Sequence, residues 1–251
     1  MTRLYCPLPL APQAVFDLPA AAARHAQVLR LQPGDPLSVF DGIGGAWTAE
    51  VVRMGRQEVS ARILATRPVQ ARPLRAVTLA VGMPANERMD WLVEKATELG
   101  VTRLVPLTTE RTVVRLQGER ATKRVAHWQA IAAGACEQSG RDLLPLIEPV
   151  QSLGQWLRDG LSVVGDGALW MRLSLAPDAQ KAARVTLGEH PALCAALGPE
   201  GGWSPAEEAA LAQAGYAPVS LGSAVLRSET AALTVLARWA DAEQSTTATT
   251  Q

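Results

Sequence analysis

The stretch Leu197-Gly198-Pro199-Glu200-Gly201-Gly202-Trp203-Ser204-Pro205 joins an apolar segment to the start of a helix through a loop with three glycines. The apolar residues 192–197 predict a buried strand. Ser204 is a favourable N-cap, Pro205 suits the first helical position, and Glu207 completes a capping box. Glycines at such a turn let the backbone approach a ligand closely. Since ligands of open α/β sheets bind at the carboxyl ends of strands, we predict a ligand crevice here.

A second turn of the same kind follows at residues 220–231 (SLGSAVLRSETA). Gly222 allows close approach to a ligand and Leu226 offers an apolar wall. Arg227 and Glu229 bring opposite charges to the start of the next predicted helix, where the helix dipole favours a carboxylate. A surface ion pair without a function is the alternative interpretation of these two residues.

Neither turn matches the common nucleotide motifs. The pattern G-x-x-G-G of residues 198–202 differs from the dinucleotide pattern G-x-G-x-x-G, and it lies near the end of the chain. The phosphate-loop pattern G-x-x-x-x-G-K-[ST] does not occur anywhere in the sequence. The predicted crevice therefore needs another kind of ligand.

The first part of the chain predicts a small β-barrel. Residues 36–41, 46–53 and 57–64 are short, β-branched segments separated by glycine-containing turns, and residues 20–30 predict a short helix before them. The segment 66–73 contains two prolines and no apolar period, so we place the domain boundary there, with a first domain at residues 1–72.

Residues 73–241 alternate between predicted strands and helices, which indicates an open parallel sheet with helices on both faces. The small, polar residues 242–251 predict a disordered tail. The predicted strands are 74–81, 102–107, 144–148, 161–165, 192–197 and 218–221, and the longer predicted helices are 86–100, 119–138, 205–214 and 229–240.

Charge is unevenly distributed although the net charge is zero. Residues 1–75 hold nine arginines and five acidic residues, a net charge of +4, whereas residues 142–251 carry a net charge of −6. The planar fork of arginine suits phosphate, so a basic N-terminal third favours a domain that faces nucleic acid. Scattered surface charge is the alternative interpretation.

The three cysteines, Cys6, Cys136 and Cys194, have no spacing typical of a metal site or a redox pair, so we expect reduced thiols and no metal. The N-terminus lacks the features of a signal peptide, and no apolar stretch is long enough to span a bilayer. We therefore expect a soluble, cytoplasmic protein that does not bind a membrane.

The segments GPEGGWSPAE (198–207) and LGSAVLRSETAA (221–232) together resemble the two C-terminal signatures of the SPOUT superfamily. More narrowly, the chain resembles the RsmE family, the 16S ribosomal RNA uracil-N3 methyltransferases. Residues 88–91 (RMDW), 95–101 (KATELGV) and 137–141 (EQSGR) also match that family in order and spacing. Residues 84–87 (PANE) lack the basic residue that the family often has before its Arg-Met-Asp helix.

The resemblance implies a PUA-like β-barrel followed by a trefoil-knotted SPOUT domain, acting as a homodimer on 16S rRNA of the small ribosomal subunit. It also implies an enzyme that takes its methyl group from S-adenosylmethionine, without a metal. The residues that the resemblance assigns to the cofactor pocket are Leu197, Gly198, Glu200, Gly201, Gly202, Leu221, Gly222, Leu226 and Arg227.

Methylation at N3 of uridine needs an aligned base and loss of the N3 proton, and electrostatic stabilisation of the uracil anion would help. Arg227 is our candidate for that stabilisation, and Glu229 either accepts the proton or orients Arg227. We expect RNA contacts from Arg3, Arg24, Arg30, Arg88 and Arg111. Two other functions stay open: a SPOUT methyltransferase for another RNA or base, and a non-catalytic ribosome-binding relic.

Overall fold

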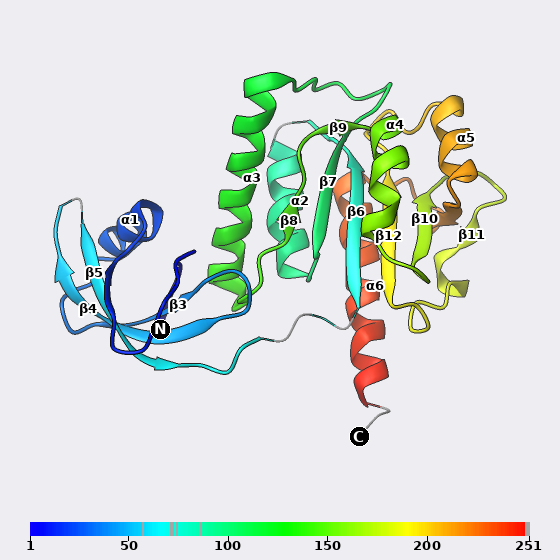
Figure 1. The fold of residues 1–251 in the computed structure, drawn as a ribbon. Coiled ribbons are helices and arrows are strands. Elements are labelled where there is room, and N and C mark those ends of the chain that lie inside the picture. The colour runs from blue at the N-terminus through cyan, green and yellow to red at the C-terminus, as the bar shows by residue number, and fades with distance from the viewer. Residues whose placement is uncertain (57, 71–72, 74, 86, 249–251) are drawn as a thin grey trace. The chain divides into compact units, whose positions relative to one another are not determined.

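The computed structural model describes residues 1–56, 58–70, 73, 75–85 and 87–248 (Figure 1). The chain divides into two compact units. Unit 1 comprises Met1–Arg72 together with Ala133–Leu144, and unit 2 comprises Pro73–Ala132 and Pro145–Gln251. The first break in the chain thus falls within the proline-containing segment 66–73, whereas residues 133–144 group with the N-terminal unit rather than with the sequence that surrounds them.

Unit 1 contains a five-stranded sheet in the order β1-β3-β4-β5-β2. Its pairings are antiparallel except for the parallel pair β1 and β3. The three predicted strands and the predicted helix are confirmed. Strands β1 and β2 were not predicted. Gln57, at the start of one predicted strand, lies outside the described residues. The elements are β1 (Thr2–Tyr5), β2 (Val15–Asp17), α1 (Ala20–Val28), β3 (Pro36–Phe40), β4 (Ala46–Met54) and β5 (Val59–Thr66).

The turn after β3 requires glycine at position 42. Gly42 has φ of 84°, and a Cβ atom there would lie 2.8 Å from Cε2 of Tyr5. The main chain of Tyr5 is fixed in turn, because its N–H donates to Oε1 of Glu137 over 2.8 Å. Oε2 of the same carboxylate lies 3.0 Å from Nδ1 of His25 on α1. Glu137 therefore holds a strand and a helix of unit 1 together.

Unit 2 contains an eight-stranded sheet in the order β11-β13-β10-β12-β6-β7-β8, with β9 paired to β7, and every described pairing is parallel. This is the open parallel sheet that the alternation of elements predicts. Its strands are β6 (Ala76–Gly82), β7 (Arg103–Thr108), β8 (Leu146–Ile147), β9 (Gln151–Ser152), β10 (Leu169–Leu173), β11 (Gln180–Lys181), β12 (Ala192–Leu197) and β13 (Ala217–Ser220). Its helices are α2 (Glu87–Glu98), α3 (Gly118–Ser139, which continues into unit 1), α4 (Leu153–Gln155), α5 (Pro205–Gln213) and α6 (Ser228–Ala248).

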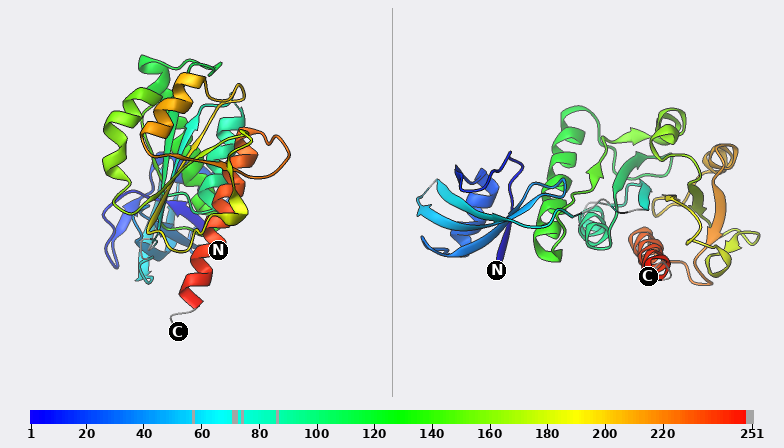
Figure 2. Two further views of the ribbon diagram at one scale, coloured as in Figure 1. Left: turned by 90° about the vertical axis from the view of Figure 1, so that its right-hand side faces the viewer. Right: turned by 60° about the horizontal axis from the view of Figure 1, so that its bottom comes forward.

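Helices cover both faces of this sheet because the side chains of its central strands alternate between two apolar cores. On β12, Leu193 and Ala195 belong to a core with α2 and α6, whereas Cys194 and Ala196 belong to a core with α4 and α5. Figure 2 shows α5 and α6 on opposite sides of the sheet. The carboxyl ends of β10, β12 and β13 consequently open between these layers.

Three details differ from the sequence predictions. Residues Leu161–Val163 form a 3-10 turn where a strand was expected, and β9, β10 and β11 were not predicted. Helix α6 extends to Ala248, past the start of the expected disordered tail, and residues 249–251 lie outside the described part of the chain. In the part of the chain that the structure describes, no helix is long and apolar enough to cross a membrane.

Candidate active site

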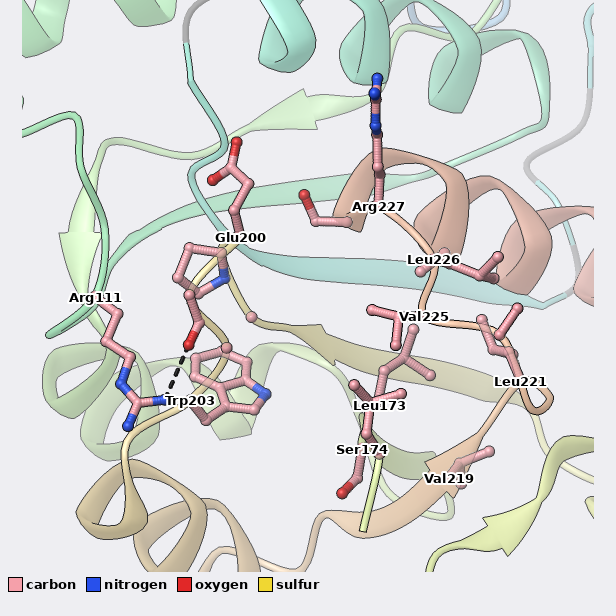
Figure 3. Close-up of a pocket in the computed structure, with 18 of the residues that line it drawn as sticks. Arg111, Leu173, Ser174, Glu200, Trp203, Val219, Leu221, Val225, Leu226 and Arg227 are labelled. Atoms are coloured by element: carbon pink, nitrogen blue, oxygen red, sulfur yellow. Dashed lines mark hydrogen bonds between the residues drawn. The ribbon is translucent and has the colours of Figure 1, made fainter.

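A pocket of about 540 Å³ lies at the carboxyl ends of β10, β12 and β13 in unit 2 (Figure 3). Its volume falls within the range of small-molecule sites, about 300–1,000 Å³. The loop after β12 and the loop after β13 form two of its walls, as the sequence predicts. The third wall comes from the end of β10 and the residues after it, Leu173, Ser174 and Leu175.

The loop after β12 is shaped by its glycines and by the start of α5. Gly202 has φ of 69°, and a Cβ atom on Gly198 would lie 3.2 Å from Cα of Gly202. The predicted capping box is confirmed: Oγ of Ser204 accepts from the N–H of Glu207 over 3.2 Å, and Oε2 of Glu207 accepts from the N–H of Ser204 over 2.9 Å. The backbone of residues 198–202 therefore faces the pocket from a fixed helix start.

The loop after β7 is tied to this glycine loop. The N–H of Glu110 donates to Oε1 of Glu207 over 2.8 Å, and Nη1 of Arg111 donates to the carbonyl of Gly201 over 2.9 Å (Figure 3). Within the loop, the N–H of Thr109 donates to Oγ1 of Thr112 over 3.0 Å. Arg111 is thereby placed in the wall of the pocket, although its residue type had suggested an RNA contact.

Glu200 of the pocket wall belongs to a small charge network around Arg88, the second residue of α2. Nη1 of Arg88 donates to Oε1 of Glu200 over 3.2 Å, and its Nε lies 4.0 Å from Oε1 of Glu229. The same Oε1 of Glu200 accepts from the N–H of Ala85 over 3.1 Å. The side chain of Glu229 is 8% exposed whereas that of Arg88 is 41% exposed, so the arginine joins a buried carboxylate to the surface.

Most of the residues predicted for the cofactor do line the pocket. The exception is Leu197, which is 1% exposed and packs in the core shared with α2 and α6. The residues of the predicted set that line the pocket are Gly198, Glu200, Gly201, Gly202, Leu221, Gly222, Leu226 and Arg227.

The two predicted catalytic residues are close in sequence but take different positions. Arg227 lines the pocket, and in Figure 3 its side chain points away from Leu221 and Val225. Glu229 is buried in the first turn of α6, where its neighbours are Ser228 and Arg88, and no ion pair between Glu229 and Arg227 is found among the described residues. The structure thus pairs Glu229 with Arg88 and leaves Arg227 at the pocket.

The apolar residues that β10 brings to the pocket were not predicted, because β10 itself was not predicted. The apolar pair Leu173 and Leu175 on either side of Ser174 was the available signal. Other pocket residues that were not assigned are Pro199, Trp203, Glu208, Val219, Ala224, Val225, Ser228 and Ala231.

The arginines expected to contact RNA in unit 1 differ in exposure. Arg24 on α1 and Arg30 just after it are exposed. The side chain of Arg3 is only 14% exposed, because it binds Asp142 over 2.7 Å and lies 4.8 Å from the ring centroid of Phe40. The side chain of Arg3 is therefore held within unit 1 and largely shielded from solvent.

No group of three or more potential metal ligands is present among the described residues. The charged residues of the pocket wall are Arg111, Glu200, Glu208 and Arg227. Two cations and two carboxylates around an apolar floor suit a ligand that carries charges of both signs on an apolar body.

Comparisons with known proteins define the class. Residues 70–240 match the family model of the RNA methyltransferase domain, and residues 18–64 match that of the RNA methyltransferase PUA domain. Ribosomal RNA small subunit methyltransferase E of Synechocystis is 33% identical over 90% of this chain and 73% of its own length.

Two solved structures resemble the whole chain. Ribosomal RNA small subunit methyltransferase E of Neisseria gonorrhoeae, bound to S-adenosylmethionine, has a TM-score of 0.85 and 34% identity and covers 95% of this chain and 96% of its own. A Legionella pneumophila protein in complex with the same cofactor has a TM-score of 0.88 and 33% identity over 96% of this chain and 97% of its own. The fold is thus that of an RNA methyltransferase with an N-terminal PUA domain.

The chain belongs to the ribosomal RNA small subunit methyltransferase E family, RsmE. The resemblance noted in the sequence is confirmed, and with it the SPOUT-type α/β fold class.

Proposed function

We propose that this protein transfers a methyl group from S-adenosylmethionine to N3 of a specific uridine in 16S rRNA of the small ribosomal subunit. The names of its relatives and the cofactor in the two related structures support the reaction class. The observation that carries the proposal is the pocket of about 540 Å³ whose walls are the two segments that resemble the family's signatures.

The pocket fits S-adenosylmethionine in size and chemistry. Leu173, Val219, Leu221, Val225 and Leu226 make an apolar region for a flat adenine ring, and the loop of residues 198–202 presents backbone groups. When bound, S-adenosylmethionine would supply an electrophilic methyl group on a sulfonium centre. The methyl group would replace the N3 proton of uridine, with the proton going to water and S-adenosylhomocysteine as the leaving group.

Arg227 is the residue we propose for stabilising the charge that develops on the uracil carbonyl oxygens. A guanidinium that lies beside the base can stabilise such charge by donating hydrogen bonds to the carbonyl oxygens. Arg227 lines the pocket and has no ion-pair partner in the described part of the chain, so its donors are available to a base.

For Glu229 we propose a positioning role. Its carboxylate does not line the pocket, and the cation nearest to it is Arg88, at 4.0 Å. The N-terminus of α6 and Arg88 both favour the ionised carboxylate. Glu229 and Glu200 together hold Arg88 beside the pocket wall to which Glu200 belongs.

We further propose residues 1–72 as the RNA-binding domain, 73–241 as the methyltransferase domain, and a cytoplasmic homodimer as the active form. Arg24 and Arg30 are exposed and can meet phosphates, and Arg88, which binds Glu200 of the pocket wall, would contact the target strand. The acidic balance of residues 142–251 leaves phosphate recognition to such arginines.

The test is mass spectrometry of the nucleosides of 16S rRNA from cells with and without the gene. The proposal predicts that N3-methyluridine disappears from the deletion strain and returns on complementation. Unchanged N3-methyluridine in the deletion strain would exclude this substrate. Loss of a different methylated nucleoside would instead support a SPOUT methyltransferase for another base. No change in any nucleoside would support a ribosome-binding protein that has lost catalytic activity.

A further inference from the structure

The pocket has two chemically different ends. Figure 3 shows Arg111 and Trp203 on one side and the apolar side chains of Leu221, Val225 and Leu226 on the other. An elongated ligand with an apolar ring at one end and charges at the other would satisfy both ends together. The positions of the charged side chains in the pocket therefore determine the orientation in which such a ligand binds.

Arg111 is built into the charged end. Its loop is anchored twice, by the pair Thr109 and Thr112 and by the bond from the N–H of Glu110 to Glu207. Its Nη1 donates to the carbonyl of Gly201, and its Cβ lies so close that a Cβ on Gly201 would be 3.0 Å away. This bond to Gly201 uses one of the five N–H donors of the guanidinium, and the fork of an arginine matches a carboxylate in geometry.

A carboxylate of the protein lies at the same pocket. Glu208 lines it from the first turn of α5, directly after Glu207, which bonds to the Arg111 loop. Glu208 and Arg111 thus offer an acceptor for an ammonium group and donors for a carboxylate on adjoining walls. An α-amino acid group carries both of these charges at neutral pH.

We propose that Arg111 binds the carboxylate of the amino-acid moiety of S-adenosylmethionine, with Glu208 facing its ammonium group. Arg111 is then a cofactor-specificity residue and not an RNA contact. This inference rests on the proposed function, because it assumes that the pocket takes S-adenosylmethionine with its adenine among the apolar side chains.

The experiment measures binding by isothermal titration calorimetry, without RNA and without turnover, using S-adenosylmethionine and its decarboxylated analogue as probes. The analogue keeps the adenosine, the sulfonium and the ammonium and lacks only the carboxylate. We expect Arg111→Gln to weaken S-adenosylmethionine binding about tenfold. This is the lower part of the range for a hydrogen bond to a charged group, and it applies because Arg111 is exposed to solvent. Binding of the analogue is expected to stay within twofold.

Arg115→Gln is the matched control, because Arg115 follows on the same connection but does not line the pocket. Its affinities for both probes should equal those of the wild type. Arg111→Lys keeps a positive charge without the fork and should bind S-adenosylmethionine with intermediate affinity.

The outcomes separate the possible roles. Equal weakening of both probes by Arg111→Gln would mean that the bond to Gly201 merely holds the loop, and it would overturn the inference. Unchanged binding of both probes, with weaker binding of small-subunit RNA, would overturn it in favour of an RNA contact. If the wild-type protein binds neither probe, the proposed cofactor itself is wrong, a failure that is visible before any variant is compared.

Discussion

The sharpest structural prediction concerns Gly82, the last residue of β6, which has no part in the chemistry. A Cβ atom at this position would lie 2.5 Å from Cδ of Pro199 and 2.7 Å from its backbone N. Pro199 belongs to the wall of the pocket, between Gly198 and Glu200. Gly82→Ala would therefore push on the loop that we propose for the cofactor.

The size of the effect follows from these distances. Ordinary carbon contacts lie near 3.5–4.0 Å, so the proline must move by roughly 1 Å. Overpacking of this kind costs about 1–3 kcal/mol of stability, and a displacement of about 1 Å at a site can cost on the order of 10²-fold in rate. We expect Gly82→Ala to bind S-adenosylmethionine at least tenfold more weakly in calorimetry, with a lowered melting temperature.

Gly134→Ala provides the control. A Cβ on Gly134 would meet no atom within 4 Å, and the residue lies inside α3. This change should raise stability by about 0.4–1 kcal/mol and leave cofactor affinity unchanged, because alanine is the better helix former. Wild-type affinity in a folded Gly82→Ala protein would refute the claim that the loop of Pro199 forms the cofactor wall.

Three further predictions concern catalysis, pH and stability. Glu229→Gln should lower the rate constant of methyl transfer less than tenfold in a single-turnover assay, whereas a fall of about 10²–10⁴-fold would show that Glu229 is a general base. Burial raises the thiol pKa to about 12 in Cys6, about 11 in Cys136 and about 12 in Cys194. Above pH 9 the unfolded state loses thiol protons that the folded state keeps. The free energy of unfolding, measured in urea, should therefore fall by up to about 1.4 kcal/mol per pH unit for each thiol between pH 9 and the folded-state pKa values of about 11 to 12. Native thiols that react readily with iodoacetamide at pH 8 would contradict this. Arg75→Met should lower the free energy of unfolding by about 2–4 kcal/mol in the same assay. The guanidinium of Arg75 donates to the carbonyls of Leu187 and His190, and its Cζ lies 3.8 Å from the ring centroid of Trp239. A loss below about 0.5 kcal/mol would mean that these contacts contribute little.

Local signals in the sequence were sufficient where the cause of a structure is local. Ser204, Pro205 and Glu207 specify a helix start by bonds within a few residues, and that start occurs as predicted. The alternation of strands and helices likewise predicted the parallel sheet. The two loops that line the pocket could be located because strands of such a sheet share one carboxyl edge.

The sequence did not predict the features that depend on contacts between residues far apart in the chain. Residues 169–173 form a strand because β12 and β13 pair with them on both sides, a context that the segment LWMRL does not reveal on its own. Residues 161–163, by contrast, have strand-like composition but form a turn. The positions of Arg88 and Arg111 depend on partners about 90–115 residues away, so residue type alone could not predict their bonds to Glu200 and Gly201.

The central claim is that S-adenosylmethionine bound in this pocket donates its methyl group to N3 of a uridine in 16S rRNA. Small ribosomal subunits from a strain that lacks the gene, incubated with the purified protein and S-adenosylmethionine labelled in its methyl group, test it directly by mass spectrometry of the rRNA nucleosides. The account predicts N3-methyluridine that carries the isotope label, made by the wild-type protein and strongly reduced with Gly82→Ala. Binding of S-adenosylmethionine without any labelled N3-methyluridine would contradict it.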